Sequence, residues 1–505
     1  MNSDKLTERE DANDKGPRTA SNVDRFLRNY PEYARTAALD RLRDHEYARL
    51  NDSGHVYLDY TGGGLHAASQ VREHVETLNS RILGNPHSAS PSSAEMTRRV
   101  ESARRAVLEY FNATDEYTVV FTPNASGALK LVAEAYPFES GSRLLMSMDN
   151  HNSVNGIREF AHAKGAVTDY APLTRPELRL DAAAMAATLE LTVPTRSHLL
   201  AFPAQSNFSG VKHSLDLVDQ AQKKGWHVLL DAAAYVPTNS LDLSTIRPNF
   251  VTISFYKMFG YPTGVGCLLV RKQVLPLLRR PWFAGGTVNF ATVQGAMHLL
   301  SPGEAGFEDG TLNYLGIPAV EIGLRYLQRV GIDLIQSRVQ CLTGWLLSEL
   351  LALRHANGRP MVRLYGPATP EQRGGTVAMN FYDRDGEFLD YRRLEELAGE
   401  QGISFRTGCF CNPGAGEAAE NLTEADMLAG FAEGDGINLA RFMQVLRKRG
   451  NKTVGALRVS LGVASNFADV ERFLTFARGL RDLSSASIGA ASVTDEDRRV
   501  FGSGA

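Results

Sequence analysis

Residues 250–266 read FVTISFYKMFGYPTGVG and place Lys257 between an apolar run and a turn rich in glycine and proline. The run 250–254 has the β-branched and aromatic composition of a buried strand, and so does the run 226–230, which is followed by Asp231. A lysine in this position has a rigid support. It is either a solvated lysine at a strand end or part of a binding site, and the rest of the chain must decide between the two.

Strand and helix patterns alternate around this stretch over roughly 200 residues, which predicts an α/β sheet with helices on both faces. A strand at 267–270 is expected to form an antiparallel hairpin with 250–254. The other expected strands are 118–121, 143–148 and 198–201, and the expected helices are 128–135, 154–164 and 216–224. Ligands of such sheets bind at the carboxyl ends of the strands. The polar residues at those ends are Ser126, His151, Asn207, Asp231 and Lys257.

At 505 residues the chain is too long for one simple core, so we expect two or more domains. The larger, mostly parallel α/β domain is predicted at 80–325. A smaller, discontinuous α+β domain is predicted from 21–79 and 326–483. The polar residues 1–20 are expected to be disordered, and the tail 484–505, rich in Ser, Ala and Gly, is expected to be flexible.

The composition excludes several classes of partner. The chain has 54 basic and 57 acidic residues and a net charge of −3, which gives no electrostatic case for nucleic acid or an anionic membrane surface. No apolar run is long enough to span a membrane, and the N-terminus has no apolar signal segment. Four cysteines are too few for a disulfide framework. We therefore predict a cytoplasmic protein with a small-molecule substrate.

Lys257 can act as an amine nucleophile toward a carbonyl cofactor, and pyridoxal 5'-phosphate (PLP) is a cofactor of this kind. PLP needs a phosphate cup, a ring that stacks on its face, an acid beside its pyridine nitrogen and a partner for its ring oxygen. The turn at Ala125 and Ser126 opens a helix whose first amides can bind phosphate, although every capped helix has such an end. The further candidates are Ser254 and Thr287 for the phosphate, His151 for the stacking ring, Asp231 for the acid and Asn207 for the ring oxygen.

Two of these candidates also have plain structural readings. His151 can be a loop histidine bonded to the backbone, and Asn207 before a Ser-Gly turn is ordinary turn chemistry. Asp231 favours the functional reading, because an unpaired carboxylate at a buried strand end is costly.

The segment 406–413, RTGCFCNP, carries Cys409 and Cys411. No second cysteine pair completes a four-ligand zinc site, so we predict no metal and a reactive thiol on a mobile loop, with Arg406 favouring the thiolate. Arg458 lies in an apolar strand pattern and is either ion-paired with an acid or a fork that binds a substrate carboxylate. The other cysteines, Cys267 and Cys341, have the surroundings of core residues.

A set of motifs then matches a known family, in the order VYLDY, GNPHS, FTPNASGALKLVAEA, FPAQSNFSG, VLLDAAA, SFYKMFGYPTGVG, FEDGTLNYLGI, FRTGCFCNPG and ALRVSLG. With these motifs the chain resembles the aminotransferase class V family, and within it the cysteine desulfurases. The resemblance is greatest to the desulfurase-like N-terminal part of molybdenum cofactor sulfurases. The motifs run from about residue 55 to 475 and so cover most of the chain.

The resemblance implies a PLP-dependent transferase of fold type I and gives the residues their roles. Lys257 would bond to the cofactor, and Cys411 would receive the sulfur. Ser126, Ser254 and Thr287 fall where the family contacts phosphate, Thr287 from the partner subunit of a homodimer. The remaining roles are Asp231 at the pyridine nitrogen, His151 on the ring face, Asn207 at the ring oxygen and Arg458 at the substrate carboxylate, with Arg406 also assigned to substrate binding.

The departures from the desulfurase pattern also carry information. Cysteine desulfurases usually have His before the lysine and Gln three residues after the aspartate, whereas this chain has Tyr256 and Ala234, as in the cofactor-sulfurase branch. The resemblance implies conversion of L-cysteine to L-alanine with a persulfide on Cys411, for a sulfur-acceptor protein or cofactor. A lyase, epimerase or aminotransferase acting on another amino acid is the alternative, since one fold hosts many chemistries. A non-catalytic scaffold that binds an acceptor protein is a further alternative.

Overall fold

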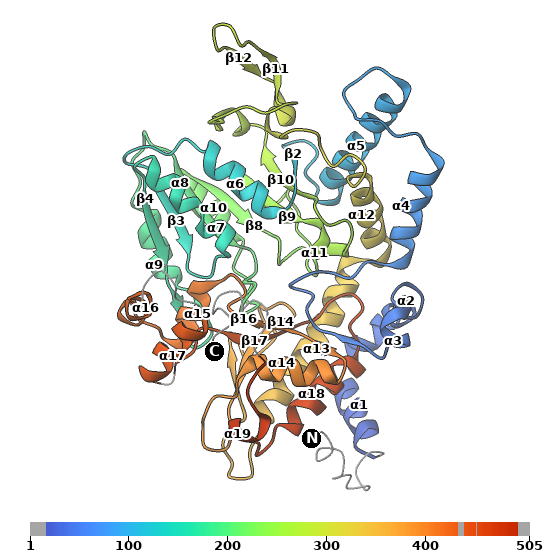
Figure 1. Cartoon of the computed structure of the whole chain (residues 1–505), viewed down its shortest axis with the longest axis vertical. Coiled ribbons are helices and arrows are strands. Elements are labelled where there is room, and N and C mark those ends of the chain that lie inside the picture. The colour runs from blue at the N-terminus through green and yellow to red at the C-terminus, as the bar shows by residue number, and fades with distance from the viewer. Residues whose placement is uncertain (1–16, 433–438, 451, 493–505) are drawn as a thin grey trace.

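A seven-stranded sheet forms the centre of the region between residues 117 and 271 (Figure 1). The computed structural model describes residues 17–432, 439–450 and 452–492. In spatial order the strands are β2 (Tyr117–Thr122), β10 (Gly266–Arg271), β9 (Phe250–Ser254), β8 (Trp226–Asp231), β7 (His198–Pro203), β3 (Arg143–Ser147) and β4 (Val167–Ala171). Only β10 in this sheet is antiparallel to its neighbours, which confirms the expected hairpin with β9. The other strands therefore end at one common edge.

Short helices and turns follow these strands at that edge. The helices are α6 (Ala125–Ala135), α7 (Asn152–Asn155), α8 (Ile157–Ala163), α9 (Ala182–Leu189), α10 (Asp216–Lys223) and α11 (Phe255–Phe259). α6 begins earlier than expected because the Asn124 side chain accepts a hydrogen bond from the Gly127 amide at 3.0 Å and caps the helix. The single helix expected at 154–164 is two helices, interrupted at Gly156. A small hairpin, β5 (Leu173–Thr174) and β6 (Arg179–Leu180), precedes α9.

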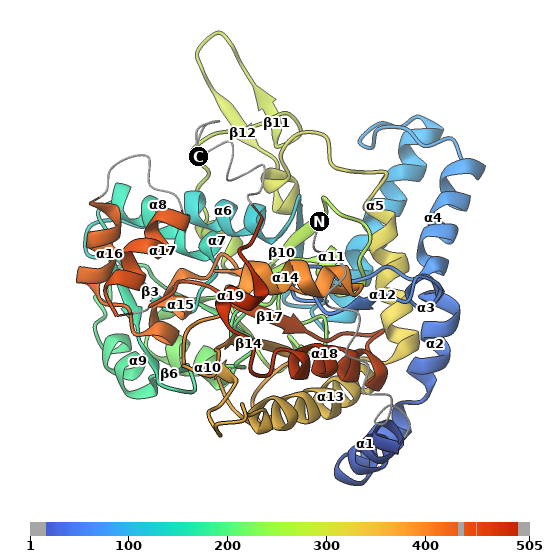
Figure 2. The ribbon, with the colours of Figure 1, turned by 60° about the horizontal axis from the view of Figure 1, so that its bottom comes forward.

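A second, four-stranded antiparallel sheet contains residues from the later part of the chain. Its order is β13 (Val362–Tyr365), β14 (Thr376–Phe381), β17 (Ala456–Ser460) and β16 (Arg406–Gly408). Figure 2 shows β14 and β17 between α14 (Tyr391–Glu400) on one side and α18 (Phe467–Gly479) with α13 (Ile332–Ala352) on the other. Beyond β16 come α15 (Pro413–Glu420), α16 (Glu424–Phe431) and α17 (Leu439–Lys448).

The N-terminal segment packs against this second sheet and its helices. It contains α1 (Pro17–Asn29), the 3-10 helix η1 (Pro31–Thr36), α2 (Ala38–Glu46), α3 (Ala48–Asp52) and β1 (Val56–Tyr57). β1 pairs in parallel with β15 (Ile403–Ser404). Phe26 stacks on Phe467 with ring centroids 4.7 Å apart, and Arg338 of α13 forms an ion pair with Asp40 at 2.6 Å. These contacts support the proposed discontinuous domain, whose boundaries stay a prediction.

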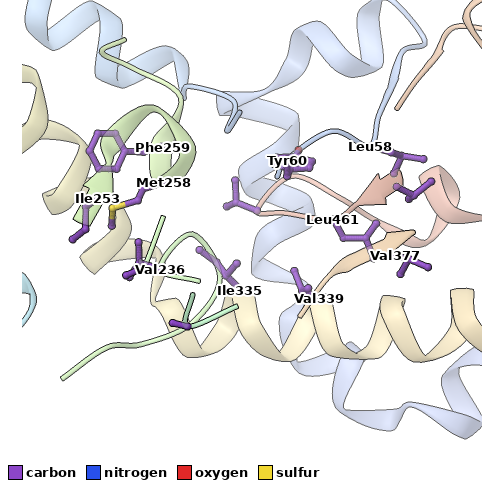
Figure 3. Close-up of a cluster of buried hydrophobic side chains, with 14 of the residues drawn as sticks. Leu58, Tyr60, Val236, Ile253, Met258, Phe259, Ile335, Val339, Val377 and Leu461 are labelled. Carbon is purple, nitrogen blue, oxygen red and sulfur yellow. The ribbon is translucent and has the colours of Figure 1, made fainter. Parts of the chain in front are cut away.

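One hydrophobic core runs from the large sheet to the small one. Figure 3 shows Ile253, Met258 and Phe259 from β9 and α11 on one side of this core. The side chains on the other side are Leu58, Val377 and Leu461, with Ile335 and Val339 of α13 between the two groups. Burial of apolar surface at about 25 cal/mol per Å² therefore joins α11 to the second sheet through α13. The buried side chains of Cys267 and Cys341 are also part of this core.

A two-stranded hairpin projects from the molecule, at the top of Figure 1. It is formed by β11 (Val288–Ala291) and β12 (His298–Leu300), between the short helices η2 (Leu275–Leu277) and η3 (Gly303–Phe307). Several large apolar side chains on it and beside it are exposed, namely Trp282, Phe283, Phe290, Val293, Met297 and Leu299. The remaining long helices, α4 (Ala68–Ser80), α5 (Pro91–Tyr110) and α12 (Pro318–Val330), pack together beside β2.

Two expectations about the chain ends need correction. Residues 17–20, predicted to be disordered, lie within α1, and residues 1–16 are outside the described part. In the predicted flexible tail, Ser485–Ile488 forms α19, because Ile488 is buried and its carbonyl accepts a hydrogen bond from Arg393 at 2.8 Å. Residues 493–505 are outside the described part. In the described ranges no helix has the length and apolar character to cross a bilayer.

Candidate functional site

A cavity of about 140 Å³ lies at the carboxyl ends of β3, β7, β8 and β9. All residues predicted to hold the cofactor line it except Thr287. Its lining is Asn124, Ala125, Ser126, Leu129, His151, Ser153, Pro203, Gln205, Asn207, Asp231, Ala233, Ala234, Ser254, Tyr256 and Lys257. Sequence reasoning missed Ser153 and Gln205, which lie only two residues from His151 and Asn207.

Lys257 lies on α11, one turn beyond β9, and is partly buried. Burial lowers the pKa of its ammonium group, an effect that Asp231 opposes by its negative charge. The glycine run after β1 packs directly on α11, since the Gly64 amide donates to the Tyr256 carbonyl at 3.0 Å. A Cβ at Gly64 would lie 2.9 Å from the carbonyl oxygen of Lys257. These glycines therefore allow a close backbone approach that fixes the lysine.

The N-terminus of α6 and two nearby serines form one end of the cavity. The Ala125 amide donates to the Ser254 hydroxyl at 2.9 Å, which leaves the O–H of Ser254 available as a donor. The hydroxyl oxygens of Ser126 and Ser153 lie 2.6 Å apart. Hydroxyl donors and a helix N-terminus in one place form an environment that favours an anion such as phosphate.

His151 and Asp231 stand at the other strand ends. The Nδ1 atom of His151 accepts a hydrogen bond from the Ser153 amide at 3.1 Å. Burial lowers the pKa of His151, so the ring is neutral near pH 7. The Oδ1 atom of Asp231 accepts from the Ala233 amide at 3.1 Å and from the Thr252 hydroxyl at 3.4 Å. The structural reading of His151 is thus correct for its Nδ1 atom, and its ring still lines the cavity.

Asn207 connects the cavity to the cysteine-bearing segment. Its side-chain amide donates to the Phe410 carbonyl at 2.8 Å, and its Oδ1 atom accepts from Asn412 at 2.8 Å. Asn412 also caps α15 and donates to the Asp149 carbonyl at 2.7 Å. An Asn directly before Pro413 at a helix start is a readable capping signal, which sequence reasoning passed over.

Cys411 is exposed and lies at the rim of the cavity, since its carbonyl accepts a hydrogen bond from the Asn152 amide, next to His151, at 2.6 Å. Phe410 and Cys411 have φ of 55° and 54°, a left-handed conformation that is uncommon outside glycine. Cys409 is partly buried. No cluster of three or more His, Cys, Asp or Glu able to hold a metal occurs among the described residues.

Arg458 and Arg406 share one acid, Asp59, which sequence reasoning did not select. Nη2 of Arg458 lies 3.0 Å from Oδ1 of Asp59, and Nη2 of Arg406 lies 2.7 Å from Oδ2. The ion-pair reading of Arg458 is therefore correct. Neither arginine lines the cavity. The Phe410 ring covers the Arg458 guanidinium at 4.5 Å, and the guanidinium donates a hydrogen bond to the Asn207 carbonyl at 3.0 Å.

Thr287 lies at the base of the projecting hairpin. Its hydroxyl donates to the Ala284 carbonyl at 2.9 Å, and the Ala284 amide donates back to it at 2.9 Å. Within one chain the structure does not bring Thr287 to the cavity.

Comparison with known proteins identifies the family. A model of the family described as aminotransferase class-V matches residues 56–473. The chain belongs to this family. The matched range contains every residue of the cavity and the cysteine segment.

Curated relatives agree with this assignment. The chain is 36% identical to molybdenum cofactor sulfurases of Solanum lycopersicum, over 92% of this chain and 60% of the relative, and of Homo sapiens, over 87% of this chain and 51% of the relative. It thus spans about three-fifths or less of these relatives' length.

The solved structures show the fold. A cysteine desulfurase from Thermococcus onnurineus NA1 superposes with a TM-score of 0.70 at 23% identity, over 87% of this chain and 97% of that chain. The cystine C-S lyase C-DES superposes with a TM-score of 0.62 at 16% identity, over 84% of this chain and 97% of that chain. The predicted α/β fold class is confirmed. Because a lyase shares the fold, the fold does not choose between desulfurase and lyase chemistry.

Proposed function

We propose that this chain is a PLP-dependent cysteine desulfurase-like enzyme that converts L-cysteine to L-alanine and forms a persulfide on Cys411. The observation that carries the proposal is the position of Cys411, held at the rim of a cavity that contains Lys257. The names of the relatives, molybdenum cofactor sulfurases, support cofactor sulfuration as the use of that sulfur. The acceptor is then a cofactor or a protein thiol.

The residues of the cavity fit PLP. The α6 N-terminus with Ser126, Ser254 and Ser153 suits its phosphate, and the neutral His151 ring suits its face. The carboxyl group of Asp231 lies at the end of β8 and lines the cavity. There it can pair with a protonated pyridine nitrogen. Bound PLP supplies an electron sink that stabilises negative charge at the substrate's α-carbon.

The chain's own groups then perform the remaining steps. Arg458 binds the substrate carboxylate, and its buried Nε atom, which has no hydrogen-bond partner among the described residues, supplies a donor. Burial lowers the pKa of Lys257 and so favours the neutral amine, which can take the α-proton as a base. The Cys411 thiolate attacks the substrate sulfur, so an S–S bond forms as the C–S bond breaks. The C–S electron pair stays with carbon, which takes up a proton, and alanine leaves.

Access to Arg458 needs movement of the cysteine segment. Phe410 covers the guanidinium. Asn207 donates a hydrogen bond to the Phe410 carbonyl and accepts one from the Asn412 side chain. The same displacement of 409–412 would free Asn207 for the PLP ring oxygen and carry Cys411 toward the substrate. We therefore place the described arrangement before substrate binding.

The proposal is tested with purified protein, PLP and L-cysteine. We expect alanine to form and mass spectrometry to place one added sulfur on Cys411. Release of pyruvate and ammonia without sulfur on the protein would instead indicate a lyase. No product from any amino acid of a panel would support the scaffold alternative.

We further propose a homodimer in which the projecting hairpin contacts the partner and brings Thr287 to its cofactor. The exposed apolar side chains of this hairpin support an interface, since monomers seldom expose such clusters. We expect sedimentation to give the mass of a dimer, and Phe290→Ser together with Leu299→Ser to shift it toward the monomer. A monomeric wild-type protein would contradict this proposal. The cytoplasmic location stays a prediction.

A further inference from the structure

Asp59, the acid that pairs with both arginines, is positioned by the glycine turn that follows β1. It follows β1, and its carbonyl accepts hydrogen bonds from the Gly62 and Gly63 amides at 3.0 and 3.1 Å. A Cβ at Gly62 would lie 2.4 Å from Oδ2 of Asp59, so only glycine leaves room for this carboxylate. The turn after β1 thus presents Asp59 to both arginines.

The two arginines differ in their surroundings. Arg458 is buried, and Asp59 is the only acid paired with it in the described ranges. The side chain of Arg406 is 54% exposed and bonds to Oδ2 of Asp59 through Nε at 2.9 Å as well as Nη2 at 2.7 Å. Arg406 and Arg458 therefore share the single negative charge of the Asp59 carboxylate.

One of the N–H donors of the Arg458 guanidinium has no hydrogen-bond partner among the described residues. Nη1 donates to the Asn207 carbonyl at 3.0 Å, and Nη2 donates to Asp59. The buried Nε atom has no partner within the described part of the chain. A guanidinium that is held by two hydrogen bonds and has one buried donor without a partner is suited to bind a further carboxylate.

The local charge also leaves room for one more anion. Two arginines face one carboxylate, and the neighbouring Glu395 is bonded to the Thr407 hydroxyl instead. Burial raises the pKa of Glu395. The ion-paired set of Arg458, Arg406 and Asp59 therefore has one more positive group than negative, and a substrate carboxylate would balance it.

Resting on the function proposed above, we propose that Asp59 sets the affinity of the site for a carboxylate-bearing amino acid, by neutralising part of the charge of Arg458 and Arg406. Asp59 stabilises the buried arginine while the site is empty, since a lone buried charge is costly. When substrate binds, the same negative charge opposes the incoming carboxylate. The product, which carries the same carboxylate, is thereby released more easily.

The test uses the holoenzyme and two amine probes that contain no sulfur and so cannot be desulfurated. L-alanine carries the carboxylate and ethylamine lacks it, and both are titrated by calorimetry. Asp59→Asn should bind L-alanine roughly tenfold more tightly than wild type, because the ligand carboxylate then replaces the acid that pairs with Arg458. Arg406→Gln should bind L-alanine roughly tenfold more weakly, because Asp59 then neutralises Arg458 fully. Ethylamine binding should change little in both variants.

The opposite signs separate this role from a structural one. If Asp59 only holds the fold, Asp59→Asn should weaken both probes, and that result would overturn the proposal. Arg406 is largely exposed, so Arg406→Gln is expected to fold, and unchanged or tighter L-alanine binding in it would also overturn the proposal. Asp469→Asn is the matched control, because Asp469 forms a buried pair with Arg43 away from the cavity. It should lower thermal stability and leave the ratio of the two affinities unchanged.

The measurements also separate this inference from the proposed function. Alanine binding needs no sulfur chemistry, so it reports on Asp59 even if L-cysteine yields no persulfide on Cys411. Persulfide formation with unaltered affinities in Asp59→Asn would keep the proposed function and remove the role of Asp59.

Discussion

Replacing Lys257 with alanine is expected to abolish covalent attachment of PLP to the chain. Lys257 is the only lysine among the described residues that line the cavity, and α11 holds it at the ends of β8 and β9. Borohydride reduction of the PLP-treated protein followed by mass spectrometry should place PLP on Lys257 in the wild type and on no residue in Lys257→Ala. Turnover of L-cysteine should fall by roughly 10³-fold or more, since cofactor attachment and proton transfer are lost together.

The control for this variant is Lys212→Ala. Lys212 is partly buried too, and burial also lowers its pKa, but it lies outside the cofactor cavity. PLP attachment should survive in Lys212→Ala. An equal yield of reduced PLP adduct in Lys257→Ala would exclude Lys257 as the attachment site.

The pH dependence of attachment follows from the pKa of Lys257. Only the neutral amine attacks a carbonyl, and it predominates above the pKa of the group. Because burial lowers the pKa of Lys257, attachment of PLP to the apoprotein should persist to lower pH than attachment to an exposed lysine.

Replacing Cys411 with alanine is expected to remove persulfide formation and to lower the release of alanine by roughly 10³-fold or more, because the nucleophile is lost. PLP attachment should be unaffected, since Cys411 does not line the cavity and contacts its rim through its backbone carbonyl. Alanine quantification and mass spectrometry after addition of L-cysteine measure both effects.

Cys409→Ala is the matched control, because Cys409 lies two residues away on the same segment and is less exposed. It should retain both activities. If Cys411→Ala kept full turnover of its amino acid substrate, the reaction would not pass through this thiol, and lyase chemistry would replace desulfuration as the proposed function.

Local sequence signals predicted the positions that line the cavity. Asp231 and Lys257 each follow a short apolar run, and Ser126 opens a helix after β2, so a strand end could be read at each position. Since parallel strands end at one edge, these residues had to converge, and they do. The helix capped by Asn124 began earlier than expected because the capping hydrogen bond outweighs the local preference of Ser126 and Gly127 for turns.

The sequence by itself determined the fold class, the polar residues that follow the strands, and the family. These depend on short local patterns and on motifs. The tertiary structure alone decided which charged and polar side chains meet. Asp59 and Arg458 are 399 residues apart, and Asn207 and Asn412 are 205 residues apart. No local pattern encodes such contacts, since they form only when the core between the two sheets brings β1, β16 and β17 to the edge of the large sheet.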